Sequence, residues 1–125
     1  EEVLRQADIV TLHCPLTETT KNLINADTLS KMKKGAFLIN TGRGPLIDEL
    51  ALVDALKTGH LGGAALDVMV KEPPEKDNSL ILAAKTMPNL IITPHIAWAS
   101  DSAVTTLVDK VMQNIEEFVQ QLNQK

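Results

Sequence analysis

With 125 residues, 44% of them hydrophobic, the chain can bury one core, and its composition is that of a water-soluble globular domain. Its 16 acidic and 12 basic side chains, with two Phe, one Trp and no Tyr, provide neither the positive charge nor the stacking surface that nucleic-acid binding requires. No apolar run approaches the roughly 20 residues that span a bilayer, the first residues are unlike a signal peptide, and the single Cys14 cannot form an internal disulfide, so we expect a cytoplasmic protein with no membrane partner.

Four mostly apolar segments predict the strands of a sheet. Aliphatic and β-branched residues fill them, and a proline, glycine or polar residue follows each one. The second and third enclose a helical segment with short connections, which is the βαβ unit of a parallel sheet with a right-handed crossover. The chain is therefore predicted to have an α/β fold. The four segments span residues 8–14, 36–39, 62–68 and 90–93.

Capping residues predict helices before and between these strands. Residues 1–8 have the pattern of the last turns of a helix, and Asn25 or Asp27 can begin a short helix. Asp48 is predicted to cap the next helix, which ends at Gly59. The buried face of that helix is predicted to hold Leu52, Val53 and Leu56.

Two further helices are expected in the last third of the chain. Residues 80–82 predict a short helical lid within a long surface loop, residues 71–87. A long amphipathic helix is predicted to begin at the cap Ser100, because apolar residues recur at intervals of three and four as far as Leu122. A stripe of that length needs more partner surface than four strands provide, so we expect the chain to pair with a second copy, exchange this helix or aggregate.

Arg43 lies in a loop at the end of the second predicted strand. The loop, residues 40–45, is rich in glycine, and the glycines on either side of the arginine let the backbone approach a ligand closely. Ligands of open α/β sheets bind at the carboxyl ends of the strands, where a guanidinium can hold a carboxylate with two parallel hydrogen bonds. The alternative is an ordinary surface arginine in a turn.

Candidates for acid–base chemistry follow the third and fourth strands. They are Asp67, Glu72 and His95, and in a parallel sheet their loops open on the same edge as that of Arg43. Together they would supply an anion clamp, a proton donor and a carboxylate that orients it. Each also has a simpler explanation, as a turn cap, a solvated loop acid and a loop histidine. A metal site is the weaker alternative, since the ligands are dispersed and of mixed type.

Four motifs, in this order and spacing, resemble the NAD-binding domain of the D-isomer-specific 2-hydroxyacid dehydrogenases. They are HCPLT at 13–17, NTGRG at 40–44, GAALDV at 63–68 followed by Glu72-Pro73, and TPHIAWA at 93–99. Trp98 in the last motif looks most like the glycerate dehydrogenase (hydroxypyruvate reductase) branch. The resemblance implies a parallel-sheet, Rossmann-like three-layer sandwich, of which this chain would be the nicotinamide-side half with a long C-terminal helix.

The resemblance also implies a reaction, in which NADH or NADPH reduces a small 2-keto acid such as hydroxypyruvate or glyoxylate, within a homodimer. Arg43 would hold the substrate carboxylate, His95 would protonate the developing alkoxide, and Glu72 would keep His95 protonated. Asp67 would contact the nicotinamide carboxamide. The residues implied to line the cofactor are Cys14, Pro15, Thr20, Thr41, Gly42, Arg43, Asp67, His95, Ala97 and Trp98.

Two parts of the family pattern are missing from the sequence, the GxGxxG half of the domain and the separate substrate domain. The GxGxxG turn and the acidic residue that receives the adenosine ribose would lie upstream of residue 1, and Gly62-Gly63 does not replace them. We therefore expect a partial domain, inactive by itself, in which residues 1–99 carry the site and residues 100–125 form the long helix. The choice between NAD and NADP stays open. The alternatives are a non-catalytic, dinucleotide-sensing scaffold of corepressor type and an inactive fragment.

Overall fold

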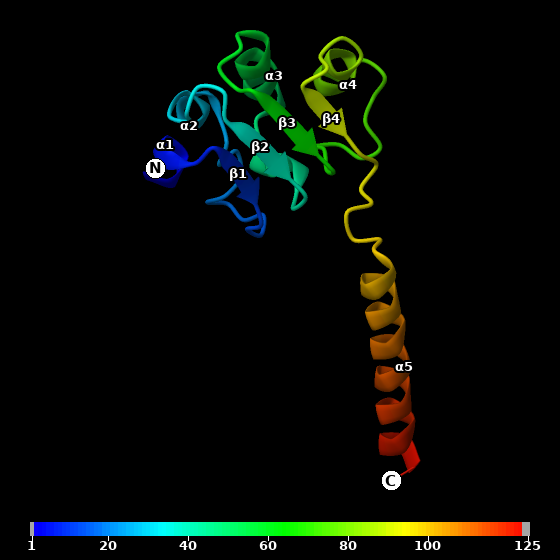
Figure 1. The fold of residues 1–125 in the computed structure, drawn as a ribbon. Helices are drawn as coiled ribbons and strands as arrows, with labels where there is room; N and C mark the ends of the chain where they lie inside the picture. Colours follow the sequence, from blue (N-terminus) through cyan, green and yellow to red (C-terminus); the bar gives the residue numbers. More distant parts are fainter. Residues whose placement is uncertain (1, 124–125) are drawn as a thin grey trace. The chain divides into compact units, whose positions relative to one another are not determined.

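The computed structural model describes residues 2–123, and the chain divides into two compact units. The first, Glu1–His95, contains the sheet, and the second, Ile96–Lys125, contains the long helix (Figure 1). The sequence predicts a division a few residues later, after residue 99. Each unit is described by itself.

A four-stranded parallel sheet forms the centre of the first unit. Its strands lie in the order β1-β2-β3-β4 and form at the four predicted segments. Strands β1, β3 and β4 are shorter than their segments, and β2 is shifted by one residue to end at Asn40. Leu12, Asn40, Leu66 and Ile92 are aligned across the sheet, so the four carboxyl ends lie at one edge. The strands are β1 (Ile9–Leu12), β2 (Phe37–Asn40), β3 (Gly63–Leu66) and β4 (Leu90–Ile92).

Helices connect the strands in the predicted order. In Figure 1, α2, α3 and α4 follow one another along the sheet, with α2 packed on α3 and α3 packed on α4. A short 3-10 turn, η1, interrupts the loop after β2, where the sequence predicts neither sheet nor helix. The helical elements of this unit are α1 (Glu2–Gln6), α2 (Ala26–Ser30), η1 (Gly44–Leu46), α3 (Glu49–Lys57) and α4 (Ser79–Ala84).

The two faces of the sheet differ in burial. One face is buried and carries the row Val10, Leu38, Ala64 and Leu90. On the other face, exposed fractions reach 60% at Ile9, 50% at Phe37 and 61% at Ile91. Successive side chains of a strand point to opposite faces, so the burial of only one row of side chains means that α2, α3 and α4 together cover one face of the sheet. The described residues thus contribute the sheet and one helical layer of the Rossmann-like three-layer sandwich.

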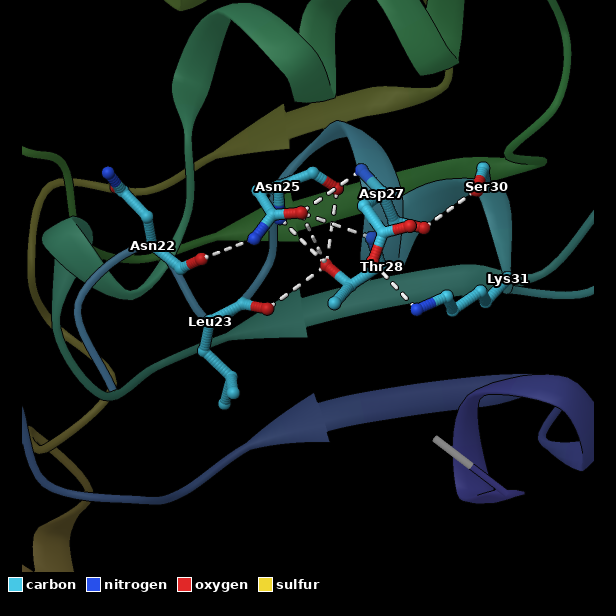
Figure 2. A network of polar contacts seen from close by, with 7 residues as sticks. All are labelled: Asn22, Leu23, Asn25, Asp27, Thr28, Ser30 and Lys31. Carbon is cyan, nitrogen blue, oxygen red and sulfur yellow. Dashed lines mark hydrogen bonds and ion pairs between the residues drawn. The ribbon is translucent and has the colours of Figure 1, made fainter. Parts of the chain in front are cut away.

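Asn25, the first of the two predicted caps, begins α2. Its Oδ1 accepts hydrogen bonds from the backbone amides of Asp27 (3.0 Å) and Thr28 (3.1 Å), while Thr28 Oγ1 accepts one from the Asn25 amide. Figure 2 shows this reciprocal capping box and the bonds that tie it to the carbonyls of Asn22 and Leu23. Capping of this kind satisfies amides that a short helix would otherwise leave without a partner.

The caps and buried face of α3 agree with the prediction. Asp48 Oδ1 accepts hydrogen bonds from the amides of Leu50 and Ala51, both at 3.1 Å, and Gly59 takes a positive φ of 69° just beyond the helix end. The residues of α3 buried in the core are Leu52, Val53 and Leu56.

Helix α4 forms where the short helix is predicted, but its description as a lid is wrong. Asn78 caps the helix, and Leu80 and Ala83 are buried in the core beside α3 and β4. Leu80 and Ala83 therefore make α4 part of the packed helical layer, because removing them from the core would expose aliphatic surface.

The second unit contains α5 (Asp101–Asn123), capped at Ser100 as predicted, with Ser100 Oγ accepting from the Ala103 amide at 3.3 Å. No residue of α5 is buried, and its apolar residues from Val104 to Leu122 are all exposed within the unit. Within the described part of the chain, no helix has the length and hydrophobicity needed to cross a membrane.

Candidate active site

Buried Asn40, the last residue of β2, fixes the backbone of the arginine loop. Its Oδ1 accepts a hydrogen bond from the Gly42 amide (3.0 Å), and its Nδ2 donates one to the Arg43 carbonyl (2.9 Å). Sequence reasoning missed this role, although an asparagine two residues before a glycine at a strand end is typical of side chains that bond their own turn.

Gly44 allows the arginine loop to touch the loop after β3. A Cβ atom built at Gly44 would lie 2.0 Å from the Met69 carbonyl, whereas one at Gly42 would approach nothing closer than 3.4 Å. The space that a Gly44 side chain would occupy is filled by the backbone of Met69 and Val70, while Gly44 itself lines the groove with Arg43. The glycine thus brings two loops of the site into contact.

The Arg43 side chain is exposed at this junction. Its Nη1 donates a hydrogen bond to the Gly42 carbonyl at 2.8 Å. Together with Glu72 and His95, Arg43 lines a groove of about 170 Å³. The structure thus brings the three predicted catalytic residues to one place.

Backbone contacts position His95 independently of its side chain. The His95 amide donates to the Asp67 carbonyl at 2.9 Å, and the residue takes a positive φ of 55° just beyond β4. Residues other than glycine rarely adopt this conformation, and those that do often lie at functional sites.

The side chains of His95 and Glu72 are in direct contact. The His95 Nδ1–H donates to Glu72 Oε2 at 2.6 Å, while Glu72 Oε1 accepts from the Met69 amide at 2.8 Å. This confirms the predicted contact between the two side chains. The bond from His95, and next that from the Met69 amide, hold the pKa of the Glu72 carboxyl below its usual value. An ionised carboxylate on Nδ1 fixes the orientation and the tautomer of the imidazole.

Asp67 is buried at the end of β3. Thr93 Oγ1 donates a hydrogen bond to its Oδ1 at 2.5 Å. Both residues line a second, larger cavity of about 570 Å³, whose walls also include Glu72 and His95. The rest of its lining is mostly apolar and includes Ile81 and other residues of α4 and β4. Thr93, whose bond fixes the Asp67 carboxylate, was also missed by sequence reasoning.

The other residues implied to line the cofactor follow β1 and β2 at the same edge of the sheet. Thr20 Oγ1 donates to the Pro15 carbonyl (2.7 Å) and accepts from the Thr17 amide (2.7 Å), which closes the loop after β1. Cys14 is half-buried against the core, as its alternative interpretation as a small hydrophobic residue requires, and Thr41 is exposed beside Gly42.

Two of the implied cofactor residues, Ala97 and Trp98, belong to the second unit. Trp98 is exposed within that unit. Among residues 2–123, no group of three or more His, Cys, Asp or Glu side chains could hold a metal ion.

Comparison with known proteins places these features in a family. Residues 1–97 match the family model of the D-isomer specific 2-hydroxyacid dehydrogenase, NAD binding domain. A candidate 2-hydroxyacid dehydrogenase of Haemophilus influenzae is 94% identical over the whole chain, and the glycerate dehydrogenase of Methylorubrum extorquens is 54% identical over 95% of it. The chain spans only 40% and 37% of the length of these two relatives.

A solved structure agrees with this match. The D-isomer specific 2-hydroxyacid dehydrogenase of Lactobacillus delbrueckii ssp. bulgaricus, in its NAD-complexed form, is 35% identical with a TM-score of 0.87. The alignment covers 95% of this chain and 39% of that structure. The chain therefore belongs to the NAD-binding domain family of the D-isomer specific 2-hydroxyacid dehydrogenases.

Proposed function

We propose that this chain is the nicotinamide-side part of a dehydrogenase that uses NADH or NADPH to reduce a small 2-keto acid to a D-2-hydroxy acid. The observation that carries the proposal is the groove shared by Arg43, Glu72 and His95. It combines a cation that can bind a carboxylate with a histidine whose partner is an ionised carboxylate. Reduction of a carbonyl beside a carboxylate needs both.

The residues present suit the nicotinamide end of a dinucleotide. The aligned strand ends place the loops after β1, β2, β3 and β4 on one edge, where α/β sheets bind cofactors. Asp67 and Thr93 offer a carboxylate and a hydroxyl for a carboxamide, and Cys14, Pro15, Thr20, Thr41 and Gly42 would line the adjoining loops. Ala97 and Trp98 complete the proposed set. When bound, the nicotinamide supplies the hydride.

The chain's own residues would then carry the rest of the reaction. Arg43 binds the substrate carboxylate and draws electron density toward the keto oxygen. His95 gives its proton to the oxygen as negative charge develops there. Glu72 holds the imidazole in place through Nδ1 and stabilises its positive charge.

For the substrate, we propose hydroxypyruvate or glyoxylate, which would yield D-glycerate or glycolate. The support is the identity of 54% to a glycerate dehydrogenase. A homodimer is proposed as well, because the apolar stripe of α5 is a surface that a monomer rarely exposes.

The test uses a chimera in which these 125 residues replace the matching segment of the Haemophilus influenzae relative. Consumption of NADH and NADPH is followed by absorbance with hydroxypyruvate, glyoxylate and pyruvate. The proposal expects turnover with the first two, and loss of turnover without loss of cofactor binding in His95→Gln.

A chimera that binds NADH but reduces none of the three acids would contradict the dehydrogenase assignment and favour the scaffold alternative. Both relatives carry dehydrogenase names, which gives that alternative no support.

A further inference from the structure

Glu49 is a side chain for which the reaction as proposed has no role. It occupies the first position of α3, directly after the segment that carries Arg43. Its two carboxylate oxygens bind different partners. Oε1 accepts a hydrogen bond from the Val70 amide at 2.8 Å, and Oε2 accepts one from Asn78 Nδ2 at 2.9 Å. One carboxylate therefore joins α3 to both ends of the loop between Met69 and Asn78.

The loop held by Glu49 is the one that presents Glu72 to His95. Met69 and Val70 are neighbours, and their consecutive amides donate to Glu72 and Glu49 respectively. Within the loop, Lys71 forms an exposed ion pair with Glu75, which does not reach α3. Glu49 and the close approach at Gly44 thus hold the start of the loop against the segment after β2.

The hydrogen-bond pattern around Asn78 fixes which of its atoms faces Glu49. Asn78 Oδ1 caps α4 by accepting from the amides of Leu80 (2.9 Å) and Ile81 (3.3 Å). Rotating the amide would turn a donor toward those two amides, so the NH₂ group must face Glu49. Glu49 therefore has to accept from two donors, whereas a glutamine has only one acceptor oxygen, so its NH₂ group would face either the Asn78 NH₂ group or the Val70 amide.

From these contacts we infer that Glu49 is a positioning residue for the reduction, holding the loop of residues 69–78 so that Glu72 stays in contact with His95. The inference rests on the proposed function and adds a residue that does not itself line the groove. A displacement of this loop by an ångström would separate a contact of 2.6 Å, and misplacement on that scale costs catalysis about tenfold to a hundredfold.

A purely structural role for Glu49 must be distinguished from this one. An acidic residue in the first turn of a helix stabilises that helix through its dipole. That contribution depends on the charge at position 49 and not on the donor presented by Asn78. Exchanging the donor and acceptor between the two positions separates the two roles.

The experiment compares four variants of the chimera. Glu49→Gln places donor against donor, Asn78→Asp places two carboxylates together, and the double variant restores one donor facing one acceptor, while the carboxylate introduced at position 78 can still cap α4. Asp54→Asn, an exposed acid-to-amide change on the same helix, is the matched control. The readouts are kcat and KM for hydroxypyruvate, the pH dependence of kcat/KM, and hydrogen exchange of the Val70 amide.

We expect kcat to fall about tenfold in each single variant, with KM for NADH unchanged and the alkaline limb of the kcat/KM profile moved to lower pH. Hydrogen exchange of the Val70 amide should be about tenfold faster in the single variants. The double variant should return kcat and the exchange rate most of the way to the parent values. The control should match the parent. The other charged groups that line the two cavities at His95 are Arg43, Asp67 and Lys85, and all of them are unaltered in these variants.

Two results would overturn the inference. One is a pH profile of kcat/KM in Glu49→Gln that matches the parent, and the other is a double variant whose kcat is no higher than that of the single variants. If the parent chimera itself lacks activity, the proposed function fails, and Val70 exchange still decides whether Glu49 holds the loop. An unchanged rate of hydrogen exchange at the Val70 amide in Glu49→Gln would then show that Glu49 does not hold the loop.

Discussion

The two sides of the groove are organised differently. On one side, His95 and Glu72 are joined side chain to side chain at 2.6 Å, and Glu72 is held in turn by a backbone amide. On the other side, the backbone around Arg43 is fixed by buried Asn40, while the exposed guanidinium donates to the carbonyl of the preceding residue. The proposed acid–base pair is thus held by side-chain contacts, and the proposed anion-binding arginine is positioned by its loop.

This difference suits the separate roles that we propose for the two sides. A proton donor has to be aligned and charged before the carbonyl reacts, and an ordered partner achieves that at little cost during the reaction. A clamp for a carboxylate binds a ligand that brings its own charge, so a well-placed loop with a long side chain is sufficient. Changes to side-chain chemistry should therefore affect the two sides in different ways.

The largest effect is expected from removing the proton donor. His95→Gln in the chimera should lower kcat/KM for hydroxypyruvate about a thousandfold, within the range that general acids contribute. Cofactor affinity, measured by fluorescence titration with NADH, should change little. Turnover within a few fold of the parent would exclude His95 as the donor.

A smaller effect is expected on the other side of the groove. Arg43→Lys keeps the charge but loses the planar fork, so kcat/KM for 2-keto acids should fall about a hundredfold. Steady-state kinetics with hydroxypyruvate provide the measurement, and NADH affinity serves as the control. Normal turnover in this variant would remove Arg43 from the site.

The contact between the arginine loop and the loop after β3 can be disrupted without changing Arg43 or His95. Gly44→Ala should lower the free energy of unfolding by about 3 kcal/mol, because the added Cβ would collide with the Met69 carbonyl. Gly42→Ala is the matched control, since its Cβ would make only ordinary contacts. Urea denaturation of both variants compares them, and equal stability would contradict the close approach at Gly44.

The smallest effect concerns stability in acid. The pKa of Glu72 is lower in the folded state than its usual value, so its ionisation stabilises the fold above that usual value, and the contribution disappears as the pH falls through the lowered pKa. The stability difference between the parent and Glu72→Gln should therefore be present at neutral pH and shrink in acid. Urea midpoints measured across that range test this, and a difference that grows in acid would contradict it.

The sequence predicts the four parallel strands and most helix caps because these depend on neighbouring residues. Asp48 and Asn25 bond amides within three positions, and apolar runs such as 36–39 predict strands directly, although only one face of the sheet is buried. The family motifs also identify Arg43, Glu72 and His95 as candidates.

What the sequence does not predict are the contacts between segments that lie far apart along the chain. Glu49 reads as an ordinary first-turn acid, yet its partner Asn78 lies in another helix cap, and Gly44 is required by a backbone that approaches only after folding. The lid assigned to residues 80–82 fails for the same reason, because the surface that buries Leu80 belongs to other elements.

The pH dependence of kcat/KM in Glu72→Gln tests most directly whether Glu72 and His95 work as one unit. Glu72 is the ionised partner of His95, so replacing it with a neutral amide should bring the loss of reductive activity to lower pH while KM for NADH stays the same. We predict an alkaline limb displaced to lower pH relative to the parent chimera. A profile that falls at the same pH in both proteins would contradict the pairing of Glu72 with His95 on which the proposed site depends.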